Sequence, residues 1–285
     1  QFVVPVVFGL TSLLGIIGNS LVIYVILSRK KMRTVTNILL LNLAFADLAF
    51  VLVIPNFTAF QYATENWIFG GAFCKIMHYL VNVTAYVTVY TLVLISVVRY
   101  ATIVKGMATV RLRTKKNIVI AILSIWVVVL ILNTPVILSY GINKPKPGVY
   151  ACVHISLKHA QKIFSTFFVF AYLLPLIVIA ILSICILHHL RSQRPTALKG
   201  KKTDQKKRKA GRLLILVVVV FAILWLPVHI HLLLAYFGKL PEAPWYQAFS
   251  VLFNLMAYFN ECVNPIIYNQ ASKEFRDAFR EAIFC

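Results

Sequence analysis

Apolar residues along this chain gather in seven long runs separated by short polar gaps. Each run is close to or above the roughly 20 residues that a helix needs to cross about 30 Å of hydrocarbon. None alternates with period two, as a membrane barrel would, and in lipid a helix satisfies its own backbone groups. The pattern therefore predicts a bundle of seven transmembrane helices, at about residues 3–28, 35–62, 72–103, 117–140, 161–190, 212–237 and 246–269.

The last residues of the chain follow a different pattern. Within 272–285 the apolar side chains recur with helical spacing, and most charged ones fall on other faces. The apolar face consists of Phe275, Ala278, Phe279, Ala282 and Ile283. This pattern predicts a short amphipathic helix on the cytoplasmic membrane surface, separate from a seven-helix core at 1–271. The terminal Cys285 is either a palmitoylation site or an unmodified thiol.

Composition and charge place the chain in a membrane and orient it. The sequence is 60% hydrophobic and 13% charged, whereas soluble domains carry about 25% charged residues. The net charge of +21 would also suit a nucleic-acid binder, but most Lys and Arg lie in the first, third and fifth gaps and in the tail. The positive-inside rule makes those segments cytoplasmic and the N-terminus extracellular. We expect a multi-pass plasma-membrane protein, and the chain to be the membrane core of a longer one.

The cysteines divide into two groups. Cys74 begins the third run and Cys152 lies in the gap after the fourth, both on the oxidising side of the membrane. A disulfide between them would tie that gap down over the mouth of the bundle, and the alternative is two free thiols. Cys185 and Cys262 lie within runs, where cysteine commonly packs as a small apolar residue.

Polar side chains cluster at one expected depth inside the bundle, and such residues are costly in lipid and usually functional. They come from the first, second and seventh runs: Asn19, Asn42, Asp47, Asn260, Glu261 and Asn264. Three interpretations remain open, namely a sodium ion bound at Asp47, a held proton, or a hydrogen-bonded core. Glu261 is the hardest of the group to explain, because a second carboxylate close to Asp47 repels it.

An arginine at the end of the third run poses a related problem. The stretch "LISVVRYATIV" (94–104) carries Arg99 and Tyr100, and the residue before the arginine is Val98. An arginine here needs a partner or access to water, and the adjacent acid that would neutralise it is missing.

Several motifs, taken in order, resemble the rhodopsin class of G-protein-coupled receptors over almost the whole chain. They are "GNSLVI", "LNLAFADLAF", Cys74, "RY", Trp126, "LLPL", "LWLP" and "NPIIY". Each is weak alone, but eight in register are specific. The stretches "WIFGGAFCKIMHYL", "VTVYTLVLISV" and "NECVNPIIYNQASKEFRDAFRE" resemble peptide receptors of the galanin and allatostatin-A type, the last leaning toward allatostatin-A.

The resemblance implies roles for particular residues. Arg99, Tyr100 and Met107 would contact a heterotrimeric G protein of the inhibitory (Gi/o) class, and Arg99 would pair at rest with an acid that is here Val98. The sodium and switch residues would be Asp47, Asn260, Asn264, Trp225 and Tyr268. Departures from the family pattern put ordinary switching in doubt, and they are Val98, Gly106, Ser183, Leu224 and Glu261.

The ligand class is narrowed by two missing residues that other receptor groups require and by the polar residues in the outer half of the bundle. Amine receptors carry an aspartate where this chain has Val81, and opsins carry a lysine where it has Tyr258. The outer half instead offers neutral donors and acceptors, which suit an uncharged, amidated peptide end. The expected ligand contacts are Gln61, His78, Asn82, Tyr86, His229, His231 and Asn254. Some of these side chains could instead only bridge helices.

Three other functions compete with that of a neuropeptide receptor. A receptor for another peptide family, such as the kisspeptin or somatostatin type, stays open as an alternative. A transporter could use the buried carboxylates, but the chain shows no internal repeat. An enzyme is not expected, because "HIHLL" and "LHHL" lack the His-Glu-x-x-His of a membrane metalloprotease.

Overall fold

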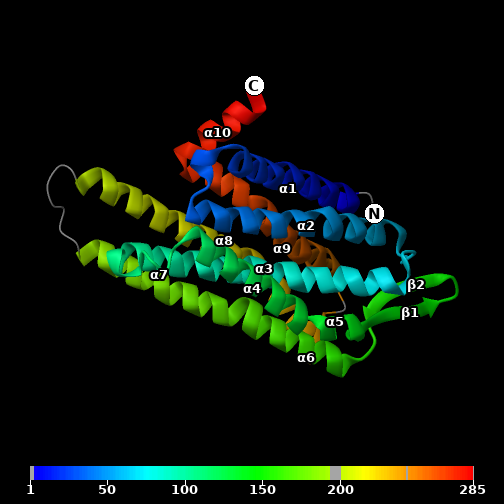
Figure 1. Ribbon diagram of the computed structural model, residues 1–285. Coiled ribbons are helices and arrows are strands. Elements are labelled where there is room, and N and C mark those ends of the chain that lie inside the picture. The colour runs from blue at the N-terminus through cyan, green and yellow to red at the C-terminus, as the bar shows by residue number, and fades with distance from the viewer. Residues whose placement is uncertain (1–2, 193–199, 242, 285) are drawn as a thin grey trace.

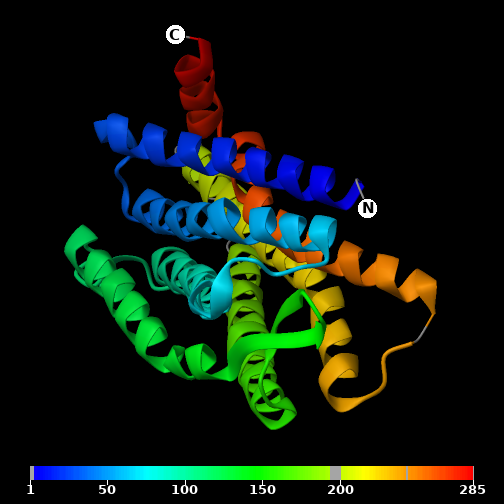
Figure 2. The same cartoon turned by 90° about the vertical axis from the view of Figure 1, so that its right-hand side faces the viewer.

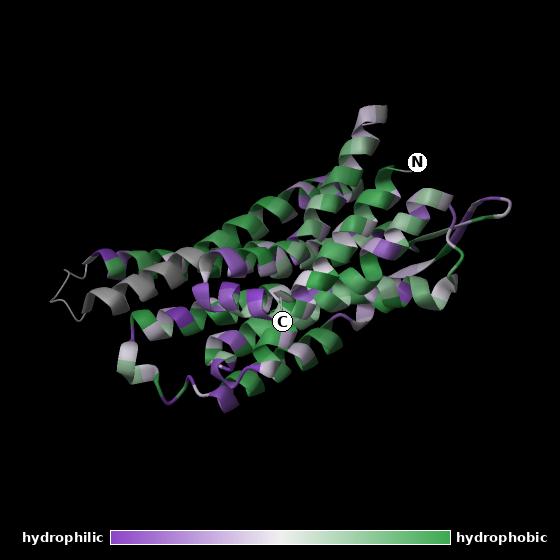
Figure 3. Cartoon of the chain, turned by 90° about the horizontal axis from the view of Figure 1, so that it is seen from above, coloured by the Kyte–Doolittle hydropathy of each residue, from purple (hydrophilic) through white to green (hydrophobic). Residues whose placement is uncertain are grey.

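The computed structural model describes residues 3–192, 200–241 and 243–284, so Cys285 lies outside the described residues. The chain forms long helices packed side by side into an elongated bundle, with a β-hairpin at one end and the short helix α10 at the other (Figure 1). Most of the ribbon in the helices is hydrophobic, and hydrophilic residues gather in the connections and the hairpin turn (Figure 3).

The first four runs become α1 (Val3–Ser28), α2 (Val35–Thr64), α3 (Gly70–Ile103) and α4 (Lys115–Leu132), which α5 (Thr134–Ser139) extends. The short 3-10 turns η1 (Lys30–Met32) and η2 (Gly106–Thr109) lie in the connections at the α10 end. Thr34 caps α2 and Thr114 caps α4, each through its hydroxyl, which accepts a hydrogen bond from a backbone amide of the first turn.

The fifth run is continuous but irregular. It consists of α6 (Leu157–Phe167), the π-helical turn η3 (Phe168–Leu173) and α7 (Leu174–Ser192). Pro175 has no amide hydrogen and its ring crowds the carbonyl one turn back, so the hydrogen-bond ladder widens just before it. The last two runs form α8 (Gly200–Phe237) and α9 (Pro244–Ala271).

Six helical stretches among the described residues are long and apolar enough to cross a membrane, and α9 is not one of them. It carries Asn254, Asn260, Glu261 and Asn264 and contains Pro265, which lowers its hydropathy. It nevertheless packs against α1, α2 and α8 within the bundle (Figure 2). Its polar side chains lie against these neighbouring helices, so low hydropathy does not prevent α9 from crossing the membrane.

The outer surface of the bundle is apolar, as expected for contact with lipid. On α1, for example, Leu10, Leu13, Leu14 and Ile17 are each more than half exposed. Exposed leucine, isoleucine and valine side chains recur on α4 and α7, and monomeric soluble proteins rarely expose apolar surface on this scale.

The tail helix α10 (Lys273–Phe284) begins after Ser272, where α9 ends. Phe275, Ala278 and Phe279 of its apolar face are buried against the bundle, whereas Ile283 is exposed. Arg29, in the connection after α1, forms a 2.8 Å ion pair with Glu281. The first gap and the tail therefore lie at the same end of the molecule.

The gap after the fourth run, for which the sequence predicted no regular structure, folds into a two-stranded antiparallel sheet. Strand β1 (Tyr140–Lys146) pairs with β2 (Val149–His154), with Ile142 opposite Cys152. Gly148 supplies the positive φ of +78° that the tight turn requires. The predicted disulfide between Cys74 and Cys152 is present and fastens β2 to the start of α3.

Candidate functional site

A cavity of about 680 Å³ opens at the hairpin end of the bundle. Its walls come from α2, α3, α6, α8 and α9, and the hairpin contributes to its rim. Trp225 is the deepest of its lining residues on α8, and its side chain is buried. The size falls within the range of cavities that enclose a drug-sized ligand or the end of a peptide. We call this cavity the cup.

Four of the seven residues expected to contact a ligand line the cup, and they are Gln61, His78, Asn82 and Asn254. Asn82 and Asn254 each donate their side-chain amide to a carbonyl one turn back in their own helix. Their carbonyl oxygens receive no hydrogen bond from any described group, so they can accept one from a ligand.

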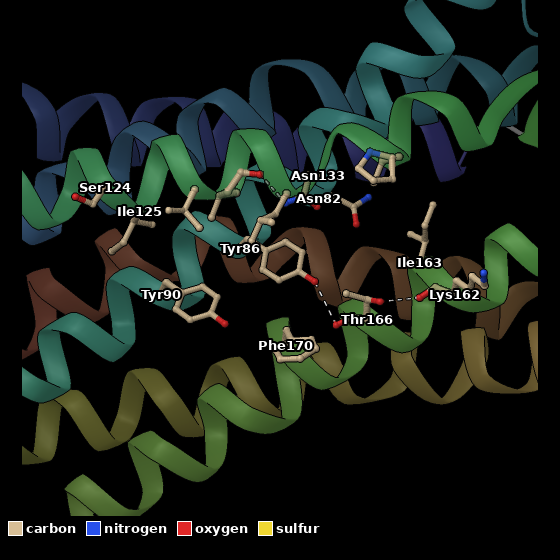
Figure 4. Close-up of a pocket in the computed structure, with 15 residues that line it drawn as sticks. Asn82, Tyr86, Tyr90, Ser124, Ile125, Asn133, Lys162, Ile163, Thr166 and Phe170 are labelled. Atoms are coloured by element: carbon tan, nitrogen blue, oxygen red, sulfur yellow. Dashed lines mark hydrogen bonds between the residues drawn. The ribbon is translucent and has the colours of Figure 1, made fainter.

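The other three expected contacts do not line the cup. His229 is buried within a cage of aromatic rings, of which Tyr172 is the nearest at 4.4 Å between ring centroids. His231 shares a 3.0 Å hydrogen bond with the hydroxyl of Tyr246. Tyr86 donates to the backbone carbonyl of Thr166 at 3.2 Å and faces a second cavity on the side of the bundle (Figure 4).

The hairpin joins the cup through a stack of rings. Tyr140 lies parallel to His78 at 3.7 Å between centroids, and His154 lies on its other side at 3.9 Å. Tyr236 of α8 meets the edge of His154 at 5.6 Å. Burial raises the pKa of Tyr140 and lowers that of His154, so both rings are neutral near pH 7. Sequence reasoning missed Tyr140, Tyr150 and His154 as cup residues because it did not predict the strands that carry them.

The described lining of the cup carries few charged side chains. Glu65 is the one acidic residue among its lining residues, and none of those residues is Lys or Arg. Lys144 lies 5.1 Å from the centre of the Tyr150 ring but does not line the cavity. A peptide end with a free carboxylate would find no cation among the described lining residues, whereas an uncharged amide would find acceptors and donors.

A buried polar core lies below the cup. Asp47 is fully buried, and it accepts hydrogen bonds from Thr88 at 3.1 Å and from Asn264 at 2.9 Å. Its carboxyl group is in contact with that of Glu261, whose Oε1 accepts from Asn260 at 3.2 Å. The expected meeting of the second and seventh helices at this depth is confirmed.

Two oxygen atoms in this core have no hydrogen-bond donor among the described residues, Oδ1 of Asn19 and Oε2 of Glu261. The amide of Asn19 donates to the backbone carbonyl of Glu261 at 2.9 Å, which places the two residues side by side. Buried oxygens without donors, beside a carboxylate, are the chemistry that a hard cation or a proton satisfies. The residues therefore fit either a sodium ion or a proton.

Arg99 stands at the opposite end of α3 and is half-buried. No described group forms an ion pair or a hydrogen bond with its guanidinium. Val98 beside it is 7% exposed and packs in the core. Tyr100 packs against the small cluster of Ile103, Ile186 and Leu190. Met107, on η2, is 85% exposed.

Trp225 and Tyr268, the expected switch residues, are both buried, and the ring of Tyr268 packs on Phe275 of α10 at 5.8 Å. Neither the indole nitrogen of Trp225 nor the hydroxyl of Tyr268 has a hydrogen-bond partner among the described residues. Both side chains are therefore held by packing, and a change in packing could move them without breaking a hydrogen bond.

Comparison with known proteins gives one consistent result. Residues 18–268 match the family described as "7 transmembrane receptor (rhodopsin family)". The allatostatin-A receptor of Bombyx mori is 36% identical over 99% of this chain and 80% of its own length. The human galanin receptor type 1 is 37% identical over 100% of this chain and 82% of its own. The mouse galanin receptor type 2 is 36% identical over 98% and 75%, respectively.

Proposed function

Since this chain belongs to the rhodopsin family of seven-transmembrane receptors, we propose that it binds an amidated neuropeptide in the cup and activates a heterotrimeric G protein. Membership makes it a multi-pass plasma-membrane receptor and not an enzyme, and it sets the transporter alternative aside. Its relatives are receptors for allatostatin-A and galanin, so a peptide of one of these two types is the proposed ligand.

The observation that carries the ligand proposal is the charge of the cup. Its lining has polar side chains for orientation, one acid at Glu65 and no cation. A C-terminal amide can donate to the free carbonyl oxygens of Asn82 and Asn254, whereas a carboxylate there would be desolvated without a partner. The opening next to the hairpin leaves room for the rest of the peptide outside.

Binding of matched peptides tests this proposal. An allatostatin-A-type peptide with a C-terminal amide should bind at least about tenfold more tightly than the same peptide with a free acid, which corresponds to about 1.4 kcal/mol. Asn254→Leu removes one acceptor from the cup and should narrow that difference. Equal affinity for amide and acid would show that the peptide end does not enter the cup.

At the opposite end, we propose that Arg99, Tyr100 and Met107 contact a G protein of the inhibitory class. The support is the unpaired guanidinium of Arg99 and the exposed side chain of Met107. Neither side chain has to break an ion pair with a described residue before it can contact the G protein. Because position 98 is valine, Arg99 has no adjacent acid that could hold its guanidinium in an ion pair.

For the buried core, we propose a sodium ion between Asp47 and Glu261 in the resting receptor. Two carboxyl groups in contact repel each other when both are ionised, and a cation between them removes that cost. The donor-less oxygens of Asn19 and Glu261 support a cation rather than a closed hydrogen-bond network. When bound, the ion would hold α2 and α9 together and so favour the resting state.

A further inference from the structure

The connection between α3 and α4 folds back onto the end of α3. It covers residues 104–114 and contains the short turn η2. Met107 and Leu112 within it are 85% and 69% exposed, so apolar side chains of this connection do not hold it by burial. A 3-10 turn of four residues has poor hydrogen-bond geometry and needs support from outside the turn. We call residues 104–114 the inner loop.

The side chain of Arg113 fastens the inner loop through three hydrogen bonds. Its Nε donates to the hydroxyl of Thr109 at 3.0 Å, and its Nη1 donates to the hydroxyl of Thr102 at 2.9 Å. Its Nη2 donates to the backbone carbonyl of Gly106 at 2.8 Å. Thr102 belongs to the last turn of α3, whereas Gly106 and Thr109 belong to η2. The planar guanidinium therefore bridges helix and loop, and we call these three contacts the clamp.

The two threonine hydroxyls of the clamp continue it to the backbone of α3. Thr102 donates to the carbonyl of Val98 at 2.6 Å, and Thr109 donates to the carbonyl of Ala101 at 2.9 Å. Each hydroxyl thus accepts a hydrogen bond from Arg113 and donates one to the helix, which uses both of its capacities. The clamp is therefore anchored in the last two turns of α3.

The carbonyl that accepts from Nη2 belongs to a residue with an unusual backbone conformation. Gly106 has a φ of +56°, in the left-handed region that glycine adopts without strain and most other residues avoid. A Cβ at this position would have no other atom within 4 Å, so lack of space does not explain the glycine. The backbone turn itself requires it, and that turn brings the carbonyl to Arg113.

The clamp differs from the charged surface around it. Arg113 is half-buried, and its three acceptors are neutral. Arg111, two residues earlier, is exposed, and its side chain forms no hydrogen bond or ion pair with a described residue. The two arginines carry the same charge, so only the geometry of the contacts sets Arg113 apart.

We propose that Arg113 is a positioning residue that holds η2 against α3 and so presents Met107 to the G protein. This role rests on the proposed contact of Met107 with the heterotrimer. A clamped loop has already lost the conformational freedom that a loose loop would lose on binding, so the clamp strengthens the complex. It has no direct effect on the peptide, because it lies at the opposite end of α3 from the cup.

Hydrogen exchange in the reconstituted receptor, without peptide or G protein, tests whether the arginine holds the loop. The amides of Val110 and Leu112 donate to carbonyls within the inner loop and report on its folding. Arg113→Gln should speed their exchange at least about threefold. Arg111→Gln removes the same charge and, as the matched control, should leave the exchange unchanged. Arg113→Lys keeps the charge but lacks the fork that reaches three acceptors, so it should behave like Arg113→Gln.

Titration with a purified inhibitory-class heterotrimer at saturating peptide tests the positioning role. Arg113→Gln should raise the half-saturating heterotrimer concentration about three- to tenfold, which is the range expected for ordering a flexible side chain and its loop. The maximal exchange rate and the peptide affinity should not change. In a Met107→Ala background, Arg113→Gln should add less than about twofold, because no long side chain is left to present.

Three results would overturn the proposal. They are unchanged hydrogen exchange in Arg113→Gln, wild-type behaviour of Arg113→Lys, and an equal effect of Arg113→Gln with and without the side chain of Met107. A wild-type chain that stimulates no heterotrimer would instead refute the proposed function. The hydrogen-exchange result needs no G protein, so it would then still decide whether the clamp holds the loop.

Discussion

Replacing Val98 by aspartate restores the acid that the family pattern places before Arg99, and the structure defines what this change meets. The side chain at position 98 is 7% exposed, and the neighbouring arginine is half-buried with no described partner. A second cation is close, because Arg113 donates to the hydroxyl of Thr102 at 2.9 Å and that hydroxyl donates to the carbonyl of Val98. Arg113 thus lies near the backbone of position 98, and Arg99 is the partner that the added acid is expected to meet.

The magnitude follows from partial burial. An ion pair with the half-exposed Arg99 at the water-facing end of α3 is worth about 0.5–1 kcal/mol, which changes the ratio of resting to active receptor by about two- to fivefold. The loss of the buried valine costs up to about 1.5–3 kcal/mol of hydrophobic stabilisation, and this term acts on folding of either state. Val98→Asn loses the same apolar surface without gaining a charge, so the difference between the two variants isolates the ion pair.

Basal nucleotide exchange on a purified inhibitory-class heterotrimer measures the effect. In one lipid composition and without peptide, Val98→Asp should exchange two- to fivefold more slowly than Val98→Asn. Peptide affinity should agree between the variants within about twofold, because position 98 lies far from the cup. Equal basal rates above background would refute the idea that the missing acid leaves Arg99 free to activate.

Three further changes give separate results. Cys152→Ser releases β2 from Cys74 and should lower peptide affinity and surface expression sharply, and unchanged binding would show that the hairpin needs no tether. Sodium should lower agonist affinity in the wild type, and the double variant Asp47→Asn with Glu261→Gln should remove that dependence. Either change alone leaves one carboxylate in the core. If the double variant still responded to sodium, the ion would bind elsewhere. Burial lowers the pKa of His154 below 6.5, so the docked hairpin is fully stabilised above pH 6.5 and loses stability as the pH falls below it. Affinity for a peptide without titratable groups should fall in the same direction, and His154→Phe, which keeps the ring stack, should reduce this dependence; an unchanged profile would assign it to other groups.

Run length alone was enough to predict the helices, because each had to cross the hydrocarbon. The hairpin was missed because Pro145 and Pro147 interrupt the alternation of apolar and polar residues that predicts a strand. The contact between Asp47 and Glu261 could be expected because both lie at the same depth in the membrane, and the position of a residue within its run gives that depth directly. The direction in which a side chain points around the helix axis is harder to predict from one sequence.

The ligand residues show this difficulty. His229 and His231 share a depth, but residues two apart on a helix point in different directions. The structure turns His229 into an aromatic cage and His231 toward Tyr246, so neither lines the cup. Their depth correctly placed both histidines in the outer half of the bundle. The direction of each side chain depends on how α8 packs against α6 and α9, and no local sequence pattern specifies that packing.

Peptide-dependent nucleotide exchange tests the central claim most directly. The chain reconstituted in nanodiscs with a purified inhibitory-class heterotrimer should exchange nucleotide faster, in a saturable manner, when the amidated peptide is added. Arg99→Gln should remove the stimulation without loss of peptide binding, because the arginine lies at the opposite end of α3 from the cup. Saturable peptide binding with no change in exchange rate on any heterotrimer would contradict a receptor that signals through G proteins.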